Sequence, residues 1–477
     1  MFSRKTLGIL MNALLTLLFL TSLHAQNWPM ADGGIGRTCW ANLETELTPP
    51  FEKAHEFSLN GSNASGMSFY DGMLFVSVGS APNNVIAFDA ETGVELWRFE
   101  IPNSQGAVNI VPAINDSLVL CGGQKGLGLY ALDRLTGAIK WLKSIGNLYT
   151  RNPILDEDRV YIVKDSLYCL DVSDGSTRWS FPFSAQATPA VDSQNVFVCG
   201  SRKLLALNKM TGELVWEIDN SEYNFAPLAI DRNFIYTMHD SAIVALRKTD
   251  HALQWSYRLP EGLPAGFSNN TIAITDSILS FIMWENAEQK GELIVLDKLS
   301  GTRLWRHSFA STGAYPAAIA NGVVYIVNWR EASAWGFDLI TGEEVFHDAS
   351  VRYVGQPIVA DHTLFFGARG HVISFKSTGS SKVYSRQNRI VSFALHQNYP
   401  NPFNPTTTIA FDVPHATNVE LTVFDMLGRQ IAMLVNKRYE PGRYDVRFDA
   451  SRFASGVYFY RVRMGDFEQT RKMLLVR

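Results

Sequence analysis

An eleven-residue pattern recurs along most of this chain and constrains its fold more than any other feature. Ala87 to Trp97 reads AFDAETGVELW, and six further copies follow between residues 131 and 346. Each copy joins two short strand-like runs through a polar turn, in which an Asp or Asn side chain can bond backbone amides and a Gly usually accepts a positive φ. The aromatic residues that end the copies are Trp97, Trp141, Trp179, Trp216, Trp255, Trp305 and Phe346.

The spacing of these aromatic residues indicates the architecture. They stand 37 to 50 residues apart. A period of roughly 40 residues built from short strands is typical of a β-propeller, in which one repeat supplies about one four-stranded blade. We interpret the aromatic side chains as flat plugs that pack between neighbouring blades, rather than as catalytic groups.

The two ends of the repeat region complement each other. HEFSL, at residues 55–59, aligns with WRFEI and places Phe57 at an aromatic position 40 residues before Trp97. Residues 352–379 contain three strand-like runs but lack a fourth. Counting Phe57, eight aromatic positions predict an all-β fold: an eight-bladed β-propeller closed by an N-terminal strand, which leaves no open sheet edge.

Composition narrows the classes of function. The net charge is −4 with 18% charged residues, so no basic surface for nucleic acid is expected. The four cysteines, Cys39, Cys121, Cys169 and Cys199, are scattered and lack metal-ligand spacing. We expect neither a disulfide nor a metal site.

The N-terminus resembles an export signal. Arg4 and Lys5 precede an apolar run from Leu7 to Leu20, and small or polar residues follow up to Ala25. This order predicts a signal peptide over residues 1–25 and a soluble mature protein outside the cytoplasm, because the run is shorter than a membrane span.

Strand direction alternates within a blade, so the tight turns share one face and the longer connections share the other. Variable loops on a rigid scaffold commonly carry function. Exposed-looking aromatic and basic residues on this long-loop face form a candidate binding site: Tyr149, Arg151, Tyr223, Trp284, Trp329, Arg330 and Tyr353. Taken singly, each can equally be a residue that packs its own loop.

The wording D-x-x-T-G-x-x-x-W, together with Trp28-Pro29-Met30, resembles the pyrroloquinoline-quinone-like propeller repeat over residues 27–379. That family includes quinoprotein dehydrogenases as well as non-enzymatic members, such as the propeller subunit of the outer-membrane β-barrel assembly machinery. The alcohol-oxidising members commonly have adjacent cysteines near the quinone, and no two cysteines are adjacent here. The resemblance therefore leaves pyrroloquinoline quinone with calcium as the alternative to no cofactor.

A second domain follows a polar segment at residues 379–392. Alternating runs over residues 393–477 predict a small Ig-like antiparallel β-sandwich. Its wording resembles the type A C-terminal sorting domain of the bacterial type IX secretion system. The resemblance rests on NYPNPFNP, DMLGR, SGVY and KML, which contain Asn401, Pro402, Asn404, Pro405, Gly428, Gly456 and Lys472. It implies secretion across the outer membrane, to the medium or the cell surface, by the type IX machinery.

The sequence thus predicts a propeller over residues 26–378 that is delivered by a sorting tail. The favoured function is non-catalytic binding of a partner protein or glycan. A secreted quinoprotein oxidoreductase is the main alternative, and a hydrolase or lyase with its site in the channel is a third, because propellers host such sites. No catalytic constellation is distinguished by spacing, and the ligand is not specified.

Overall fold

The computed structural model describes residues 27–378 and 393–476, apart from 28–29, 35–38, 42–43, 45, 80–83, 103–109, 124–125, 149–151, 186, 201, 220–227, 240–241, 260–271, 286–289, 312, 316, 399, 414–415, 441 and 466. The expected signal peptide and linker lie outside these residues. Within the described part, one short 3-10 helix, η1 (Ala31–Gly33), accompanies a chain of strands. None of its helical segments has the length and apolar character needed to cross a membrane.

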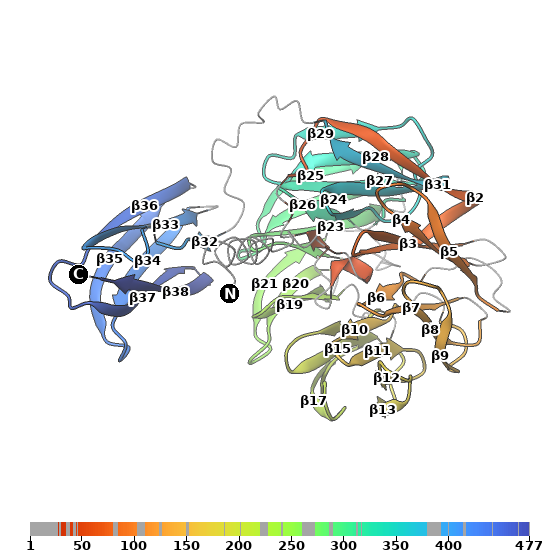
Figure 1. The fold of residues 1–477 in the computed structure, drawn as a ribbon, viewed down its shortest axis with the longest axis horizontal. Coiled ribbons are helices and arrows are strands. Elements are labelled where there is room, and N and C mark those ends of the chain that lie inside the picture. The colour runs from red at the N-terminus through yellow and green to blue at the C-terminus, as the bar shows by residue number, and fades with distance from the viewer. Residues whose placement is uncertain are drawn as a thin grey trace, which may run out of the picture.

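Five four-stranded antiparallel sheets follow one another along the chain, each made by one repeat (Figure 1). Within each sheet the strands pair in chain order. Their bounds are β6 (Ala113–Ile114), β7 (Leu118–Gly122), β8 (Leu129–Asp133) and β9 (Ile139–Lys143); β10 (Ile154–Asp156), β11 (Arg159–Val163), β12 (Leu167–Asp171) and β13 (Thr177–Phe181); β14 (Ala190–Val191), β15 (Asn195–Gly200), β16 (Lys203–Asn208) and β17 (Leu214–Asp219); β18 (Leu228–Ile230), β19 (Phe234–His239), β20 (Ala242–Arg247) and β21 (Leu253–Arg258); β22 (Ala273–Ile274), β23 (Ile278–Glu285), β24 (Lys290–Asp297) and β25 (Arg303–Phe309).

Burial along the strands explains their sequences. Strand β7 is buried throughout and reads as a continuous apolar run, whereas the outermost strand β9 alternates and is largely exposed. A strand covered on both faces must be apolar at every position, but an outer strand needs apolar residues on one side only. Ala131 on β8 pairs with Trp141 on β9, and a β-bulge follows this pair. The same alanine-to-tryptophan pairing recurs at Ala206 and Trp216.

A sixth repeat sheet gains a fifth strand from the N-terminal segment. It consists of β26 (Ala318–Ala320), β27 (Val323–Asn328), β28 (Ser333–Asp338) and β29 (Glu344–Asp348). Strand β1 (Trp40–Ala41) pairs in parallel with β26, at the inner edge of this sheet.

The remaining repeat sheet joins the two ends of the repeat region. It contains β30 (Ile358–Ala360), β31 (Thr363–Ser377), β2 (Phe51–Tyr70), β3 (Met73–Val78), β4 (Asn84–Asp89) and β5 (Glu95–Glu100), paired in that order. The first half of β2 pairs with β31, from Phe51 opposite Ser377 to Ser58 opposite His371, and its second half pairs with β3. The N-terminal strand therefore completes the last repeat.

The structure corrects the residue expected at the aromatic position of this strand. In the complete repeats the tryptophan lies opposite the residue before a β-bulge, as in Ala87 opposite Trp97. In the last repeat the equivalent pair is Ser374 opposite His55. His55 therefore occupies the plug position, and Phe57, two residues on, is fully buried opposite Val372.

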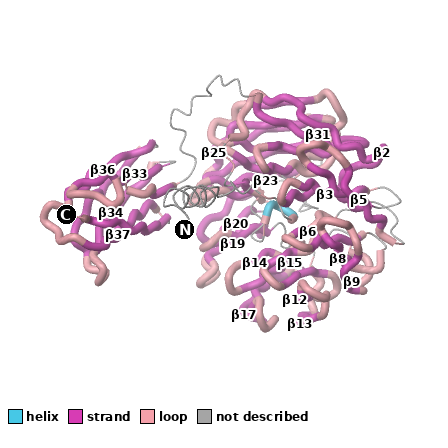
Figure 2. The backbone as a smooth tube through the Cα atoms, viewed as in Figure 1, coloured by secondary structure: helices cyan, strands magenta, loops and turns pink. Residues whose placement is uncertain are grey.

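The seven sheets stand around a common centre, in which η1 lies (Figure 2). Their facing surfaces are packed with buried apolar residues, so the core is a series of layers between neighbouring sheets rather than one central cluster. The four cysteine side chains are all buried within these layers.

The C-terminal domain is built from two small antiparallel sheets. One contains β32 (Ala394–Leu395), β33 (Thr406–Val413) and β36 (Gly442–Asp449); the other contains β35 (Gln430–Tyr439), β34 (Thr417–Phe424), β37 (Gly456–Met464) and β38 (Phe467–Leu475). Both contribute to one hydrophobic cluster, which includes Phe411, Leu421 and Tyr460.

Candidate binding face, central channel and sorting tail

Three of the seven residues predicted for the long-loop face can be placed in full. Trp329 and Arg330 lie in the connection between β27 and β28, and Tyr353 precedes β30. Trp284 is in β23, but its side chain is not described. Tyr149, Arg151 and Tyr223 lie outside the described residues.

Trp329 and Arg330 form a braced, partly exposed tip. The Asn328 side chain is buried; its Oδ1 accepts hydrogen bonds from the Arg330 and Glu331 amides at 3.1 Å and 3.3 Å. The Arg330 guanidinium lies 5.2 Å from the centre of the Trp329 ring. The turn thus presents an aromatic surface beside a planar cation, a pair suited to stacking on a sugar ring or on a peptide side chain.

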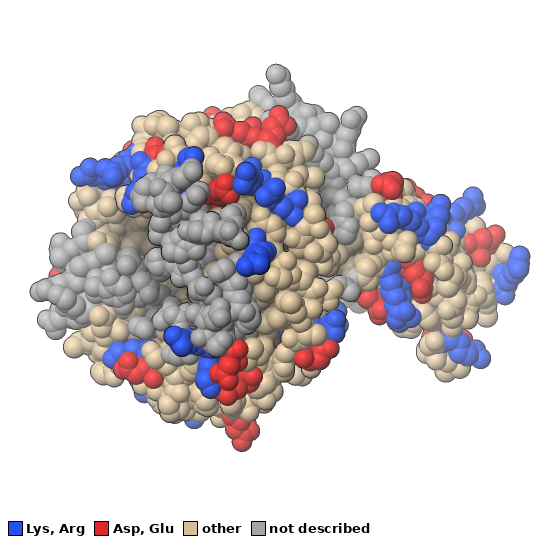
Figure 3. All heavy atoms as spheres, turned by 180° about the vertical axis from the view of Figure 1, so that it is seen from behind, with Lys and Arg blue, Asp and Glu red and all other residues tan. Residues whose placement is uncertain are grey.

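The expected exposure of Tyr353 is wrong. Its side chain is fully buried, and its ring packs edge-on against Phe366 at 5.5 Å between centroids. Tyr353 also forms an isolated bridge with Ala368, so it is a packing residue of the last repeat. On the face seen in Figure 3, Lys and Arg side chains are interspersed with Asp and Glu, and no single sign of charge predominates over the described surface.

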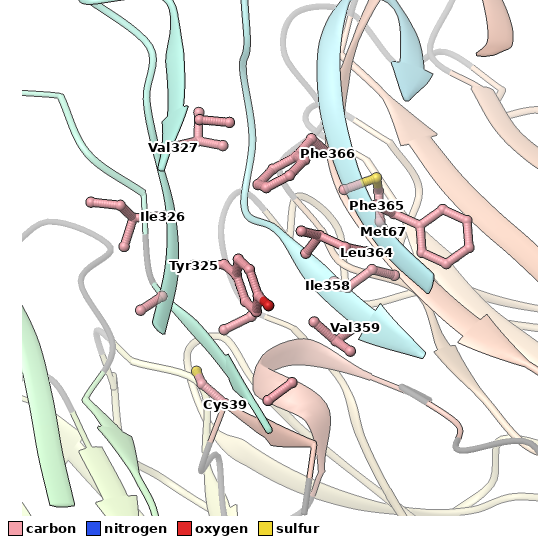
Figure 4. Packing of buried hydrophobic residues seen from close by; sticks show 14 of the residues in the cluster. Cys39, Met67, Tyr325, Ile326, Val327, Ile358, Val359, Leu364, Phe365 and Phe366 are labelled. Carbon is pink, nitrogen blue, oxygen red and sulfur yellow. The ribbon is translucent and has the colours of Figure 1, made fainter. Parts of the chain in front are cut away.

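Described residues of the chain's N-terminal segment, among them 30–34 and 39–41, lie at the centre of the ring. Met30 belongs to a hydrophobic cluster that includes Leu120 and Val163, and Cys39 belongs to the cluster that includes Tyr325 and Val359. Asp32 is buried there; its Oδ1 accepts hydrogen bonds from Gln356 Nε2 at 3.2 Å and from Cys39 Sγ at 3.5 Å. Figure 4 shows Cys39 beside Tyr325 and Val359. From the sequence, only the closing strand at the end of this segment was predicted. The packing of the residues before it was not predicted.

Hydrogen bonds to Glu44 anchor the N-terminal segment on the tight-turn face. The Glu44 side chain is buried, and its carboxylate accepts hydrogen bonds from the amides of Glu46, Leu47 and His362. The same carboxylate lies 3.2 Å from His362 Nδ1. Partial burial lowers the pKa of His362, but the hydrogen bond and charge of Glu44, together with the charges of Glu46 and Asp361, raise it by more, so the net direction is upward.

A quinone with calcium does not fit the described residues of this centre. Helix η1 and strand β1 lie in this centre, and the buried Asp32 carboxylate accepts hydrogen bonds from Gln356 and Cys39. Over the part of the chain that the structure describes, no three His, Cys, Asp or Glu side chains gather as a metal site would require.

In the C-terminal domain, residues from motifs far apart in the sequence converge. Asn401 Oδ1 accepts a hydrogen bond from the Leu474 amide at 2.8 Å, and the Phe403 amide donates to the Leu474 carbonyl at 3.0 Å. Pro402 and Asn404 flank Phe403 in this loop.

The other sorting residues occupy defined structural positions. The Pro405 carbonyl accepts a bond from the Ala450 amide at 2.9 Å. Gly456 lies opposite Leu475 at the start of β37, and Lys472 lies opposite Phe459. Gly428, at φ +75°, closes the turn between β34 and β35.

Comparison with known families agrees with this geometry. Residues 32–145, 76–181 and 163–385 match the family model described as outer membrane protein assembly factor BamB, and together they cover more than half of the chain. The chain belongs to this family. Residues 397–476 match a second model, the secretion system C-terminal sorting domain. The recognition made from the sequence is confirmed: BamB-type, PQQ-like repeats precede a type IX sorting domain.

Relatives of this BamB family member include proteins of different kinds. An uncharacterized protein of Rickettsia prowazekii is 26% identical over 36% of this chain and 45% of its own length. Quinohemoprotein alcohol dehydrogenase ADH IIB of Pseudomonas putida is 23% identical over 66% of this chain and 48% of its own. The chain thus spans less than half the length of these curated relatives.

Solved structures share the fold of the repeat domain. BamB from Moraxella catarrhalis superposes with a TM-score of 0.56 and 15% identity, covering 69% of this chain and all of that one. Quinohemoprotein alcohol dehydrogenase from Comamonas testosteroni superposes with a TM-score of 0.61 and 14% identity, covering 75% and 81%. The fold is therefore that of PQQ-type propellers. The sorting domain indicates secretion across the outer membrane and interaction with the type IX machinery.

Proposed function

We propose that this chain is a secreted or cell-surface, non-catalytic propeller that binds a partner protein or a glycan through its long-loop face. The observation that carries the proposal is the burial of described N-terminal residues at the centre of the ring, where η1 lies. Because Met30, Asp32 and Cys39 are packed where many propellers hold a small-molecule site, contact with a ligand is left to the outer faces. Trp329 and Arg330 are the described residues on the long-loop face that are best placed for it.

The proposal includes an eight-bladed ring. Six repeats form separate sheets, and the sheet that contains both β2 and β31 supplies two blades if β2 is divided where its pairing partner changes. After a register shift beyond Ser58, that change falls between Asn63, opposite Arg369, and Ala64, opposite Val78. The division gives a last blade that is closed by the N-terminal strand. It supports limits of 26–378 for the propeller. We propose limits of 393–477 for an Ig-like sorting sandwich.

Binding by the Trp329 tip can be tested with the full secreted chain on arrays of bacterial and mammalian glycans and on a peptide display library. We expect a saturable ligand whose affinity falls at least tenfold in the double variant Trp329→Ala with Arg330→Ala. Arg303→Ala, a substitution on outer strand β25, serves as a matched control and should leave the affinity unchanged. Equal binding by the double variant and the control would contradict the assignment of the tip.

The quinoprotein alternative is favoured by the relatives that are quinohemoprotein alcohol dehydrogenases. A titration of the protein with pyrroloquinoline quinone and calcium, followed by absorbance and calorimetry, separates the two functions. Saturable one-to-one binding with oxidation of an alcohol or sugar would favour the oxidoreductase. We expect no saturable binding, because residues of the N-terminal segment are buried at the centre of the ring.

A further inference from the structure

An exposed apolar pair lies at one end of the C-terminal domain. Met426 and Leu427 stand in the turn between β34 and β35, where 71% and 78% of their surface is exposed. The turn is ordered: Asp425 Oδ1 accepts hydrogen bonds from the Leu427 and Arg429 amides at 2.9 Å and 3.0 Å. Two large apolar side chains are thus held out to solvent by a polar turn that does not need them for its own fold.

Strand register brings the other motif segments to the same end of the sheet. Phe424, which precedes the turn, lies opposite Phe459 on β37. Gly456, where β37 begins, lies opposite Leu475 near the end of β38. Phe403 bridges to Leu475 in turn. The four segments that carried the resemblance therefore meet along one edge, which we call the motif end: residues 401–403, 424–428, 456–459 and 474–476.

Apolar side chains extend from the motif end onto the outer face of the four-stranded sheet. Directly opposite residues share a face, as do residues two apart on one strand. Phe424, Phe459, Val457 and Leu474 therefore lie on one face, while Met473 and Leu475 point into the core with no exposed surface. Leu474, 36% exposed, adds to the exposed apolar surface of the turn. The Arg461 guanidinium lies 4.6 Å from the centre of the Phe424 ring, and Lys472 lies opposite Phe459, so basic groups border this apolar surface.

The opposite end of the same sheet faces the repeat domain. At Gly465, in the turn between β37 and β38, an added Cβ would lie 3.8 Å from Leu299 of the repeat domain. Phe467 and Glu468 line a cleft of about 610 Å³ together with Arg232 and Lys298 of the repeats. Since β37 and β38 run between the two ends, the motif end is turned away from the repeats, as Figure 1 shows by the position of the C-terminus.

We propose that the motif end is the surface by which the type IX secretion machinery grips the folded tail. The partner is a protein of that machinery with an apolar groove that accepts Met426 and Leu427, flanked by Leu474 and the Asn401 loop. Residues from four segments are adjacent only after folding, so the partner reads a folded domain. The surface lies away from the repeats, so the grip is independent of the cargo. This inference rests on the sorting role of the tail and not on the ligand of the propeller.

The test compares secretion of two double variants from a bacterium that has the type IX system. In Met426→Ser with Leu427→Ser, the polar turn is kept and the apolar pair is lost. The matched control is Leu135→Ser with Met210→Ser, since these are exposed apolar residues in the same kind of turn within the repeats. We expect the tail variant to accumulate in the periplasm with at least a tenfold fall in secretion, while the control is secreted normally.

Two further measurements keep the outcome decisive. Thermal unfolding of both purified variants shows whether the tail still folds; Leu427→Ser alone, a milder change at the most exposed residue of the turn, replaces the double variant if it does not. A photo-reactive residue at position 427 should crosslink to a component of the secretion machinery, and one at position 135 should not. Normal secretion of a folded tail variant would overturn the proposal. So would a dimer of the full chain that the tail substitutions dissociate, because the surface would then serve self-association. Ligand binding by the propeller enters none of these readouts.

Discussion

At the scale of single residues, the recurring turn glycine is fixed by the tryptophan of the preceding repeat. Gly301, at φ +70°, lies over Trp255, and an added Cβ would stand 2.6 Å from the indole ring. Gly137 meets Trp97 in the same way, at 2.7 Å. The repeat without the glycine has His251 there, at φ +60°, with its ring 4.3 Å from that of Trp216. The glycine is therefore required by close contact between blades as well as by the turn.

Substitution of the two kinds of glycine separates these requirements. Gly301→Ala should lower the free energy of unfolding by about 3 kcal/mol, because it adds overpacking against Trp255 to a strained φ. Gly72→Ala has a similar φ of +73° and open space around the added Cβ, so it should cost only about 1 kcal/mol. Denaturant midpoints of the repeat domain measure both. Equal losses would mean that the tryptophan contact does not constrain the glycine.

At the scale of elements, neighbouring sheets are joined by a repeated two-part contact. Trp255 Nε1 donates a hydrogen bond to the Lys298 carbonyl at 2.7 Å, and Lys298 Nζ lies 2.8 Å from Asp231 Oδ2 in the preceding repeat. Lys209 combines the same two roles with Trp179 and Asp156. The lysine that follows the Asp or Asn of the turn, Lys298 or Lys209, is thus held both by its backbone carbonyl and by its side chain.

Breaking one such ion pair should be costly. In Lys298→Met, Asp231 stays largely buried without its cation, and we expect a loss of about 3 kcal/mol in the free energy of unfolding. Adding Asp231→Asn should restore most of it, because the stranded charge is removed. Equilibrium unfolding of the single and double variants gives the coupling. A double variant no more stable than Lys298→Met would refute this account.

The fastening of the N-terminal segment predicts a pH dependence. The pKa of His362 is raised from its ordinary value of 6.5. A raised pKa gives a stabilising contribution that is complete below the unfolded value and is lost as the pH rises through the folded value. Below about pH 6 the wild type should therefore have a higher unfolding midpoint than His362→Gln, and this difference should shrink as the pH rises above the ordinary histidine pKa of about 6.5. A difference that stays constant as the pH rises would exclude His362 as the titrating group.

At the scale of the whole molecule, the ring depends on one strand pairing between distant parts of the chain. His55 donates its amide to Ser374 Oγ at 3.1 Å, and Phe57 is buried between Phe88 of the first repeat and Phe365 of the last. The first half of β2 therefore links two repeats through backbone and side chains together. No other pairing within the described repeats spans so much of the sequence.

Deletion of residues 50–60 tests this closure. Without the strand, β31 has an open edge and the first and last repeats lose their shared core, so the whole repeat domain should unfold at a lower denaturant concentration and less cooperatively. A deletion of equal length in the predicted linker, residues 379–389, should leave the transition unchanged. Unchanged cooperative unfolding after the first deletion would rule out the closure model.

Much of this fold follows from local patterns, and the exceptions have physical causes. The repeat period, the polar turns and the tail motifs depend on residues close together in the chain, so all three can be predicted from the sequence. The plug position of His55 was missed because a β-bulge, and not the aromatic residue, sets the register. The burial of Tyr353 depends on how β31 folds back to place Phe366 against its ring. The packing of Cys39 at the centre of the ring depends on contacts such as that with Gln356, 317 positions away. No local sequence pattern marks either contact.

The pairing of β2 with β31 also sets an order of events during export. The amide of His55 and its partner Ser374 are separated by 319 positions. The closing strand is therefore synthesised early, but it cannot pair until the last repeat has been synthesised. Contacts of such high sequence separation form late and slowly, because a long loop must be ordered before they are made. The repeats can stack as they are made, but the native ring is reached only once residue 377 is available to pair. Since the sorting tail follows directly, closure of the cargo and exposure of its export signal fall at nearly the same moment.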